Sequence, residues 1–320
     1  MNENLNQLTP WSEQFLEADE CSAPCSRHNV QVVCNSKVVL NVDLADRPFG
    51  DLPSQRRVLL GEHRIEAAVF EIKFAGNTDV LSSEDAAAML VVLSGRTSVT
   101  RLDTAEQHEM SVLFGPEGAA QPSMQVTSRG WRFSSPDDSE IFTILPNVAF
   151  VQVRAYERWS LSLKPHVEAL LIAVEARCVP SVVQRLGLRY INRLTGADGE
   201  GSERWAERIT PAFRGPLADP IVGPKLRGAH QQLQFELEPG IGVLINHGLV
   251  PDEATNSFGY LIDLDVFDER STSFELDDLL VRSQRMNRTA NNLFLLMLTP
   301  TQIDQMEPTT IDDNADERMM

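Results

Sequence analysis

The chain has 320 residues with 46 acidic and 28 basic side chains, which gives a formal net charge of −18. Apolar residues make up 42% of it, which is enough for a packed interior and excludes global disorder. The acidic excess also excludes a nucleic-acid footprint over the whole surface, because phosphate binding needs clustered lysine and arginine. The net charge does not exclude a local basic patch. The excess is uneven, since residues 251–320 hold 15 acidic and 5 basic side chains.

The compartment is predicted from what the sequence lacks. Residues 1–16 have neither the basic start nor the apolar stretch of a secretory signal. The densest apolar run, residues 293–298, is far shorter than the roughly 20 residues that span a bilayer. Four cysteines do not make a disulfide framework. We therefore expect a cytoplasmic protein without a membrane partner.

The pattern of apolar residues divides the chain into four parts. Residues 1–60 form an irregular leader, 61–180 and 181–300 form two α+β halves, and 301–320 form an acidic, disordered tail. In the first half, Phe70, Ile72 and Phe74 alternate with charged residues, which is typical of a half-buried strand. The predicted elements of this half are a strand, a helix, three strands and a helix, at residues 65–74, 82–95, 131–134, 140–145, 149–156 and 159–176.

The second half is predicted to repeat that order. Its elements are a strand, a long connection, three strands and a helix, at residues 182–194, 195–225, 231–238, 241–248, 260–267 and 274–298. Thr272 and Glu275 have the spacing of a capping box at the start of the last helix. The offset between the halves is roughly 115 residues, and the interpretation rests on element order alone. Either an internal duplication or a coincidental order explains it. The fold class is α+β, with helices on one face of an antiparallel sheet.

Four segments carry a resemblance to a known family. They are residues 65–74 (IEAAVFEIKF), Tyr156-x-x-Trp159, residues 185–193 (RLGLRYINR) and residues 261–267 (LIDLDVF). Together they resemble a sporadically distributed, functionally uncharacterised bacterial family with "iveavfeirF", "Y-x-x-W", "RlGLRYiNri" and "lDiDvf" segments. The resemblance covers about residues 63–300 and implies no catalytic residue. The patchy occurrence of such a family suggests mobile defence or toxin–antitoxin genes.

Two constellations could hold a metal. Cys21, Cys25, His28 and Cys34 supply enough thiolate and imidazole ligands for a tetrahedral zinc site, although their spacing matches no common zinc motif. The other interpretation is a set of reduced cysteines in the leader.

Asp51 with Glu71-x-Lys73 has the order of a metal-dependent nuclease, in which carboxylates hold Mg²⁺ and the lysine polarises the phosphate or water. A solvated ion pair between Glu71 and Lys73 is the competing interpretation.

Arginines stand at regular intervals in two places. Arg185, Arg189 and Arg193 are four residues apart, so strand alternation points all three to one face. They could bind phosphate or an acidic partner, or they could pair across strands with Asp263 and Asp265, and the pairing is favoured. On the last predicted helix, three arginines could bind an anion or lie on a solvated face, and the solvated face is favoured. These are Arg282, Arg285 and Arg288.

The sequence contains no Walker loop, dinucleotide fingerprint, zincin motif or nucleophile elbow. We therefore predict a non-catalytic binding module that acts through another protein, as a sensor, adaptor or neutralising partner. The acidic C-terminal region would suit a basic partner. The alternatives are a metal-dependent nuclease and a local nucleic-acid binder. No cofactor is expected apart from the zinc alternative.

Overall fold

The structure is a computed structural model, and it describes residues 45, 47–50, 52–53, 58–61, 65–76, 81–114, 120–196, 201–252 and 257–310. In 107–114, 120–127 and 310 it describes the backbone alone. The zinc candidates Cys21, Cys25, His28 and Cys34 and the nuclease candidate Asp51 lie outside the described residues.

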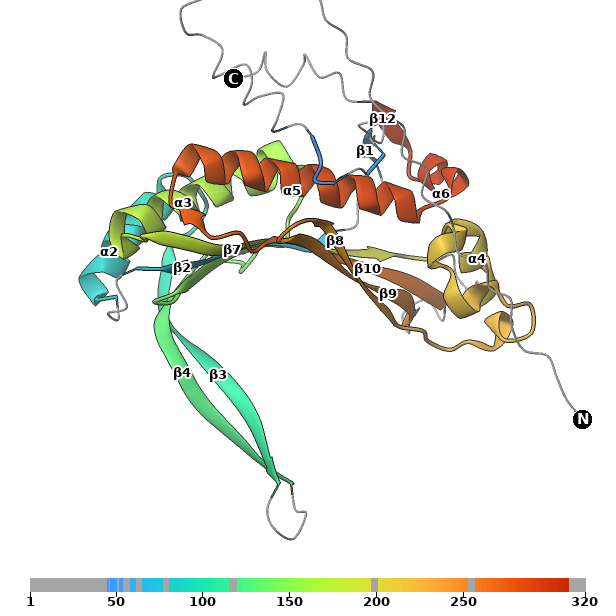
Figure 1. The fold of residues 1–320 in the computed structure, drawn as a ribbon, viewed down its shortest axis with the longest axis horizontal. Coiled ribbons are helices and arrows are strands. Elements are labelled where there is room, and N and C mark those ends of the chain that lie inside the picture. Colours follow the sequence, from blue (N-terminus) through green and yellow to red (C-terminus); the bar gives the residue numbers. More distant parts are fainter. Residues whose placement is uncertain are drawn as a thin grey trace, which may run out of the picture.

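One large antiparallel sheet dominates the fold (Figure 1). Its strands lie side by side in the order β3 Arg101–Phe114, β4 Ala120–Ser134, β5 Glu140–Ile144, β6 Val148–Val153, β2 Ile65–Ala75, β7 Val182–Leu194, β10 Ser257–Asp268, β9 Ile241–Asp252 and β8 Gln231–Glu238. The short strand β11 (Thr272–Ser273) also pairs with β7. The predicted α+β class with an antiparallel sheet is confirmed.

The two predicted halves have the same strand arrangement. In each half the first strand pairs with the last, β2 with β6 and β7 with β10. The remaining strands follow outward in reverse chain order, and β3 extends the first half by one strand. Antiparallel pairing of β2 with β7 joins the halves. This strand order is compatible with an internal duplication, and the duplication itself stays a hypothesis.

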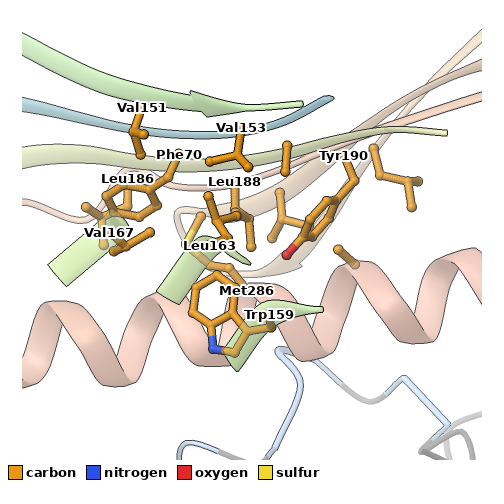
Figure 2. Close-up of a cluster of buried hydrophobic side chains, with 14 of the residues drawn as sticks. Phe70, Val151, Val153, Trp159, Leu163, Val167, Leu186, Leu188, Tyr190 and Met286 are labelled. Atoms are coloured by element: carbon orange, nitrogen blue, oxygen red, sulfur yellow. The ribbon is translucent and has the colours of Figure 1, made fainter. Parts of the chain in front are cut away.

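Three helices cover one face of the sheet: α2 (Ser83–Ser94), α3 (Lys164–Cys178) and α5 (Leu276–Met297) (Figure 1). The core lies between them and the central strands. Figure 2 shows strand side chains such as Phe70, Leu188 and Tyr190 facing Leu163 and Met286 from the helical layer. Because strand residues alternate, burying these positions leaves their neighbours on the opposite face.

The helix starts differ in how well the sequence predicts them. Ser82 caps α2, since its hydroxyl accepts from the backbone of Asp85 at 3.1 Å and the Asp85 carboxylate accepts in return. A π-helical turn, Trp159–Leu163, precedes α3. The predicted capping box of α5 is wrong, because Thr272 lies in β11 and its hydroxyl accepts from Arg282 instead.

The longest connection of the second half covers one end of the core. Between β7 and β8, the described residues form four short 3₁₀ helices and α4 (Trp205–Arg208). Trp205 is fully buried, stacks on Tyr260 and donates from its indole to the carbonyl of Phe258. Beside it, buried His247 contacts the Tyr260 hydroxyl through Nδ1 at 2.8 Å. This end of the molecule is therefore packed around aromatic side chains.

Strands β3 and β4 form a long hairpin that the sequence does not predict. Its outer part extends beyond the body of the sheet, on the side opposite the helices (Figure 1). The end of β4 pairs with β5 and belongs to the sheet. The hairpin therefore borders the face of the sheet that the helices leave open.

The ends of the fold lie outside the predicted halves. β1 (Val58–Leu60) pairs with β12 (Pro308–Thr310), and α6 (Pro300–Gln305) precedes that pair. The sequence predicts a leader up to residue 60 and a disordered tail from 301. Instead, β1 from the first segment and β12 from the second pair with each other in a separate two-stranded sheet, and Met306 between α6 and β12 is buried, so residues 301–310 are ordered. Among the described residues, no helix combines the length and apolar character that crossing a membrane would need.

Candidate functional site

The face of the sheet opposite the helices, called here the open face, carries the predicted arginines. Leu186, Leu188 and Tyr190 are buried on the helical face of β7. The alternate positions, Arg185, Arg189 and Arg193, therefore share the open face, as the sequence predicts. Each is held by a carboxylate from a neighbouring strand.

Arg189 forms a two-pronged pair with Asp263 of β10. Its Nε and Nη2 donate to the two carboxylate oxygens, both at 2.7 Å. The Arg189 side chain is 48% exposed, whereas that of Asp263 is 6% exposed. The hydrogen bonds that Arg189 donates to the Asp263 carboxylate raise the pKa of Arg189. Arg189 thus covers a buried carboxylate and still presents one side to solvent.

Arg185 bridges three carboxylates. Its Nη1 donates to Glu71 of β2 at 2.6 Å and its Nη2 to Asp265 of β10 at 3.2 Å, while Nε lies 3.9 Å from Glu269. The guanidinium also lies 5.6 Å from the centre of the Phe267 ring. Arg185 is therefore fixed from both neighbouring strands.

Arg193 and Lys73 also pair with carboxylates on the open face. Arg193 donates from Nε to Glu66 of β2, and Lys73 lies 3.8 Å from Glu71. The predicted pairing with Asp263 and Asp265 is confirmed for Arg189 and Arg185. Arg193 pairs instead with Glu66, a partner that the sequence pattern does not indicate.

The charges of this network nearly cancel. Its four cations, Lys73 and the three arginines of β7, pair with five carboxylates, which leaves the network with a net charge of about −1. Burial raises the pKa of Asp265, and the nearby Arg185 and Arg189 oppose that shift. A desolvated carboxylate inside a charge network is a common property of functional sites.

Apolar side chains lie between and beside these charges. Half-buried apolar residues of the open face, placed there by their register with the charged positions, include Val69, Phe150, Ile191, Leu244, Leu261 and Phe267. Phe150 stands opposite Glu71, and Leu244 stands opposite Asp265. The open face is thus a mosaic of apolar side chains around paired charges.

The nuclease candidates are only partly placed. Glu71 and Lys73 share the open face of β2, as their spacing predicts, and Asp51 lies outside the described residues. Glu71 accepts from Arg185, which occupies the carboxylate that a metal ion would need. In the described part of the chain, no group of three histidine, cysteine or acidic residues could hold a metal.

The predicted solvated face of the last helix is wrong for two of its arginines. Arg282 is buried and donates to Asp268 at 2.9 Å and to Thr272 at 2.8 Å. Arg285 is largely covered and lies 4.1 Å from the ring centre of Phe49. The sequence shows the spacing of the arginines but not the buried Asp268 that attracts the first of them.

The four segments of the family resemblance meet around β7. Residues 65–74 and 261–267 belong to the two strands that flank it. Tyr156 packs edge-on against Tyr190, and Tyr190 donates to Asn287 of α5 at 2.9 Å. The four segments that carry the family resemblance therefore pack together at the centre of the sheet.

The comparisons with known proteins do not identify the chain. No family model and no curated protein sequence matches it. Two weakly similar solved structures are of the RNA triphosphatase Pct1 of S. pombe, each at 9% identity. One covers 86% of this chain and 98% of that chain with a TM-score of 0.13, and the other, in complex with the Spt5 CTD, covers 87% and 94% with 0.11. Similarity this low carries no argument about fold or function.

Proposed function

We propose that this protein is a non-catalytic binding module whose partner is another protein that lies on the open face, beside the β3–β4 hairpin. One observation carries the proposal: a broad sheet face bears a mosaic of half-buried apolar residues and paired charges, and α2, α3 and α5 all lie on the other side (Figure 1). Faces of this composition suit protein contacts, which combine apolar anchors with complementary charge.

The charges favour a protein over a nucleic acid. Each arginine of the open face is already held by a carboxylate, so a phosphate would have to displace that carboxylate first. The ion-pair network of the open face has a net charge of about −1 and the chain one of −18, so the overall charge gives no long-range attraction of a polyanion.

The same charges favour a basic partner. Because burial raises the pKa of Asp265, a cation placed next to it would stabilise its charged form. The acidic residues 251–320 would also speed the encounter with a basic protein. If the chain belongs to a mobile defence or toxin–antitoxin system, as the resemblance suggests, a toxin or nuclease encoded nearby is the first partner to test.

The test begins with affinity purification of the full chain from its native host. The affinity of the purified partner is then measured for Phe150→Ala on the open face and for the control Leu161→Ala, which is exposed on the helical side. We expect Phe150→Ala to weaken binding about tenfold or more, and Leu161→Ala to leave it unchanged. Both variants should keep the melting temperature within a few degrees.

Two results would overturn the proposal. One is equal affinity of Phe150→Ala and the wild-type chain. The other is hydrolysis of DNA or RNA with Mg²⁺ or Mn²⁺ that Lys73→Ala abolishes, which would establish the nuclease alternative.

A further inference from the structure

A short segment of the leader lies on the body of the protein as a bound peptide would. Residues 47–50 and 52–53 contact α5 and the end of β8, far away in the sequence. The backbone of the segment contributes to these contacts: the carbonyls of Arg47, Pro48 and Pro53 accept hydrogen bonds, and the amides of Phe49 and Gly50 donate them.

One stripe of α5 makes most of these contacts. Arg285 donates to the carbonyls of Arg47 and Pro48, at 3.2 and 3.5 Å. Thr289 accepts from the amide of Phe49 at 2.9 Å, and Asn292 donates to Pro53. Positions 285, 289 and 292 follow each other at four and three residues, so they share one side of the helix. The helix therefore presents a row of polar groups that fits an extended backbone.

The ring of Phe49 is the anchor of the segment. It is 0% exposed, and the guanidiniums of Arg285 and Arg270 lie 4.1 and 5.9 Å from its centre. Carboxylates hold both arginines, since Arg285 pairs with Glu238 at 3.3 Å and Arg270 with Asp268 at 2.7 Å. The two cations are thus positioned for an aromatic ring, which a guanidinium attracts.

The position after Phe49 favours glycine. Gly50 has φ of +70°, and its amide donates to Glu238 at 3.0 Å. A Cβ atom there would lie 3.1 Å from the carbonyl oxygen of Leu237. Backbone conformation and space therefore both favour glycine after the aromatic residue.

We propose that Glu238, Arg270, Arg285 and Thr289 form a peptide-recognition socket, called here the Phe49 socket, specific for an aromatic-glycine segment. The chain fills it in cis with its own residues 47–50, and the occupant is exchangeable, so that the same segment supplied in trans can take its place. Binding in the Phe49 socket then fixes the position of the leader against the second half. This inference uses the helical side of the sheet and does not rest on the proposed function.

The test uses the full chain with Phe49→Ala, which empties the ring position. A synthetic peptide of residues 45–53 is titrated into this variant by calorimetry. We expect binding and a rise in the melting temperature, since a ligand of the folded state stabilises it. The same peptide with alanine at the Phe49 position should not bind, and the wild-type chain should bind the peptide about tenfold more weakly because its socket is occupied.

Several results would overturn the inference. One is a folded Phe49→Ala chain that does not bind the peptide, and another is equal binding by the wild-type chain. A wild-type dimer that Phe49→Ala converts to monomer would show that a second copy fills the socket, which contradicts occupation in cis. If Phe49→Ala does not fold, Phe49→Leu serves in the same titration, because it keeps an apolar side chain but removes the ring.

Discussion

The guanidinium of Arg185 lies over Gly187, two residues further along β7. A Cβ atom at Gly187 would lie 2.5 Å from Nη1 of Arg185, the atom that donates to Glu71. The missing side chain thus gives Arg185 the space to lie on the sheet, between the carboxylates of its two neighbouring strands. This relationship gives a physical role to the glycine within the RLGLRYINR segment.

Gly187→Ala is therefore expected to displace Arg185 and to separate it from Glu71 and Asp265. We predict a loss of about 1–3 kcal/mol in the free energy of unfolding, measured by urea denaturation. Gly228→Ala is the matched control, because the nearest atom to a Cβ there, the carbonyl oxygen of Leu249, is 3.8 Å away. Equal stability of the two variants would show that Arg185 does not need this space.

Arg189 and Asp263 should depend on each other for stability. Arg189→Ala leaves a carboxylate buried without its two hydrogen bonds, which should cost about 2 kcal/mol in the free energy of unfolding. We expect Asp263→Ala to destabilise as well, and the double variant to lose less than both single losses together. The exposed pair Arg96 and Glu168 is the control, for which the same cycle should give less than about 0.5 kcal/mol. Additive losses at Arg189 and Asp263 would contradict the pairing.

Arg282 is predicted to fix α5 to the sheet through Asp268. Arg282→Met removes hydrogen bonds to Asp268 and Thr272, and we expect a loss of about 2 kcal/mol, because Arg270 still holds Asp268. Arg204→Met, at an exposed pair with Glu207, should change the free energy of unfolding by less than about 0.5 kcal/mol. Thermal and chemical unfolding both measure this difference, and two equally stable variants would contradict it.

His247 should make the protein less stable in mild acid. Burial lowers its pKa to about 4, and nearby His230 adds to that shift. Because the unfolded chain takes up this proton near pH 6.5, the contribution of His247 is complete above that pH and is lost as the pH falls towards 4. The loss should amount to about 3 kcal/mol at most.

Urea denaturation between pH 7 and 4 tests this window. His247→Gln cannot take up the proton, so its stability should fall less steeply over this range than that of the wild-type chain. Parallel curves for the two proteins would show that His247 does not determine the acid sensitivity.

Alternation and turn residues predict the long helices and the strands of the main sheet, with the exception of β3, β11 and all but the end of β4. The limits of β7 and β8 agree with the sequence prediction, because apolar residues alternate along β7 and turn residues flank β8. The pattern of apolar residues does not predict the β3–β4 hairpin. Its outer strands pair mainly with each other, so no apolar face pattern marks them.

Pairs in the candidate site were predictable where both residues lie on strands that the sequence pattern reveals. Arg189 and Asp263 stand on strands whose alternation is visible, so their pairing could be expected. The Phe49 socket could not be predicted, because Arg270 and Arg285 reach Phe49, and Glu238 reaches Gly50, from positions more than 180 residues away. Contacts of that range depend on tertiary packing, which the local sequence does not reveal.

Footprinting of the open face tests the central claim most directly. The full chain, free and bound to the partner purified with it, is exposed to hydroxyl radicals, and side-chain oxidation is measured residue by residue. Phe150, Leu261 and Phe267 should become protected in the complex, whereas Val91 and Leu161 on the helical side should react as before. Protection of Val91 and Leu161 with no change at Phe150, Leu261 and Phe267 would contradict the assignment of the open face as the binding surface.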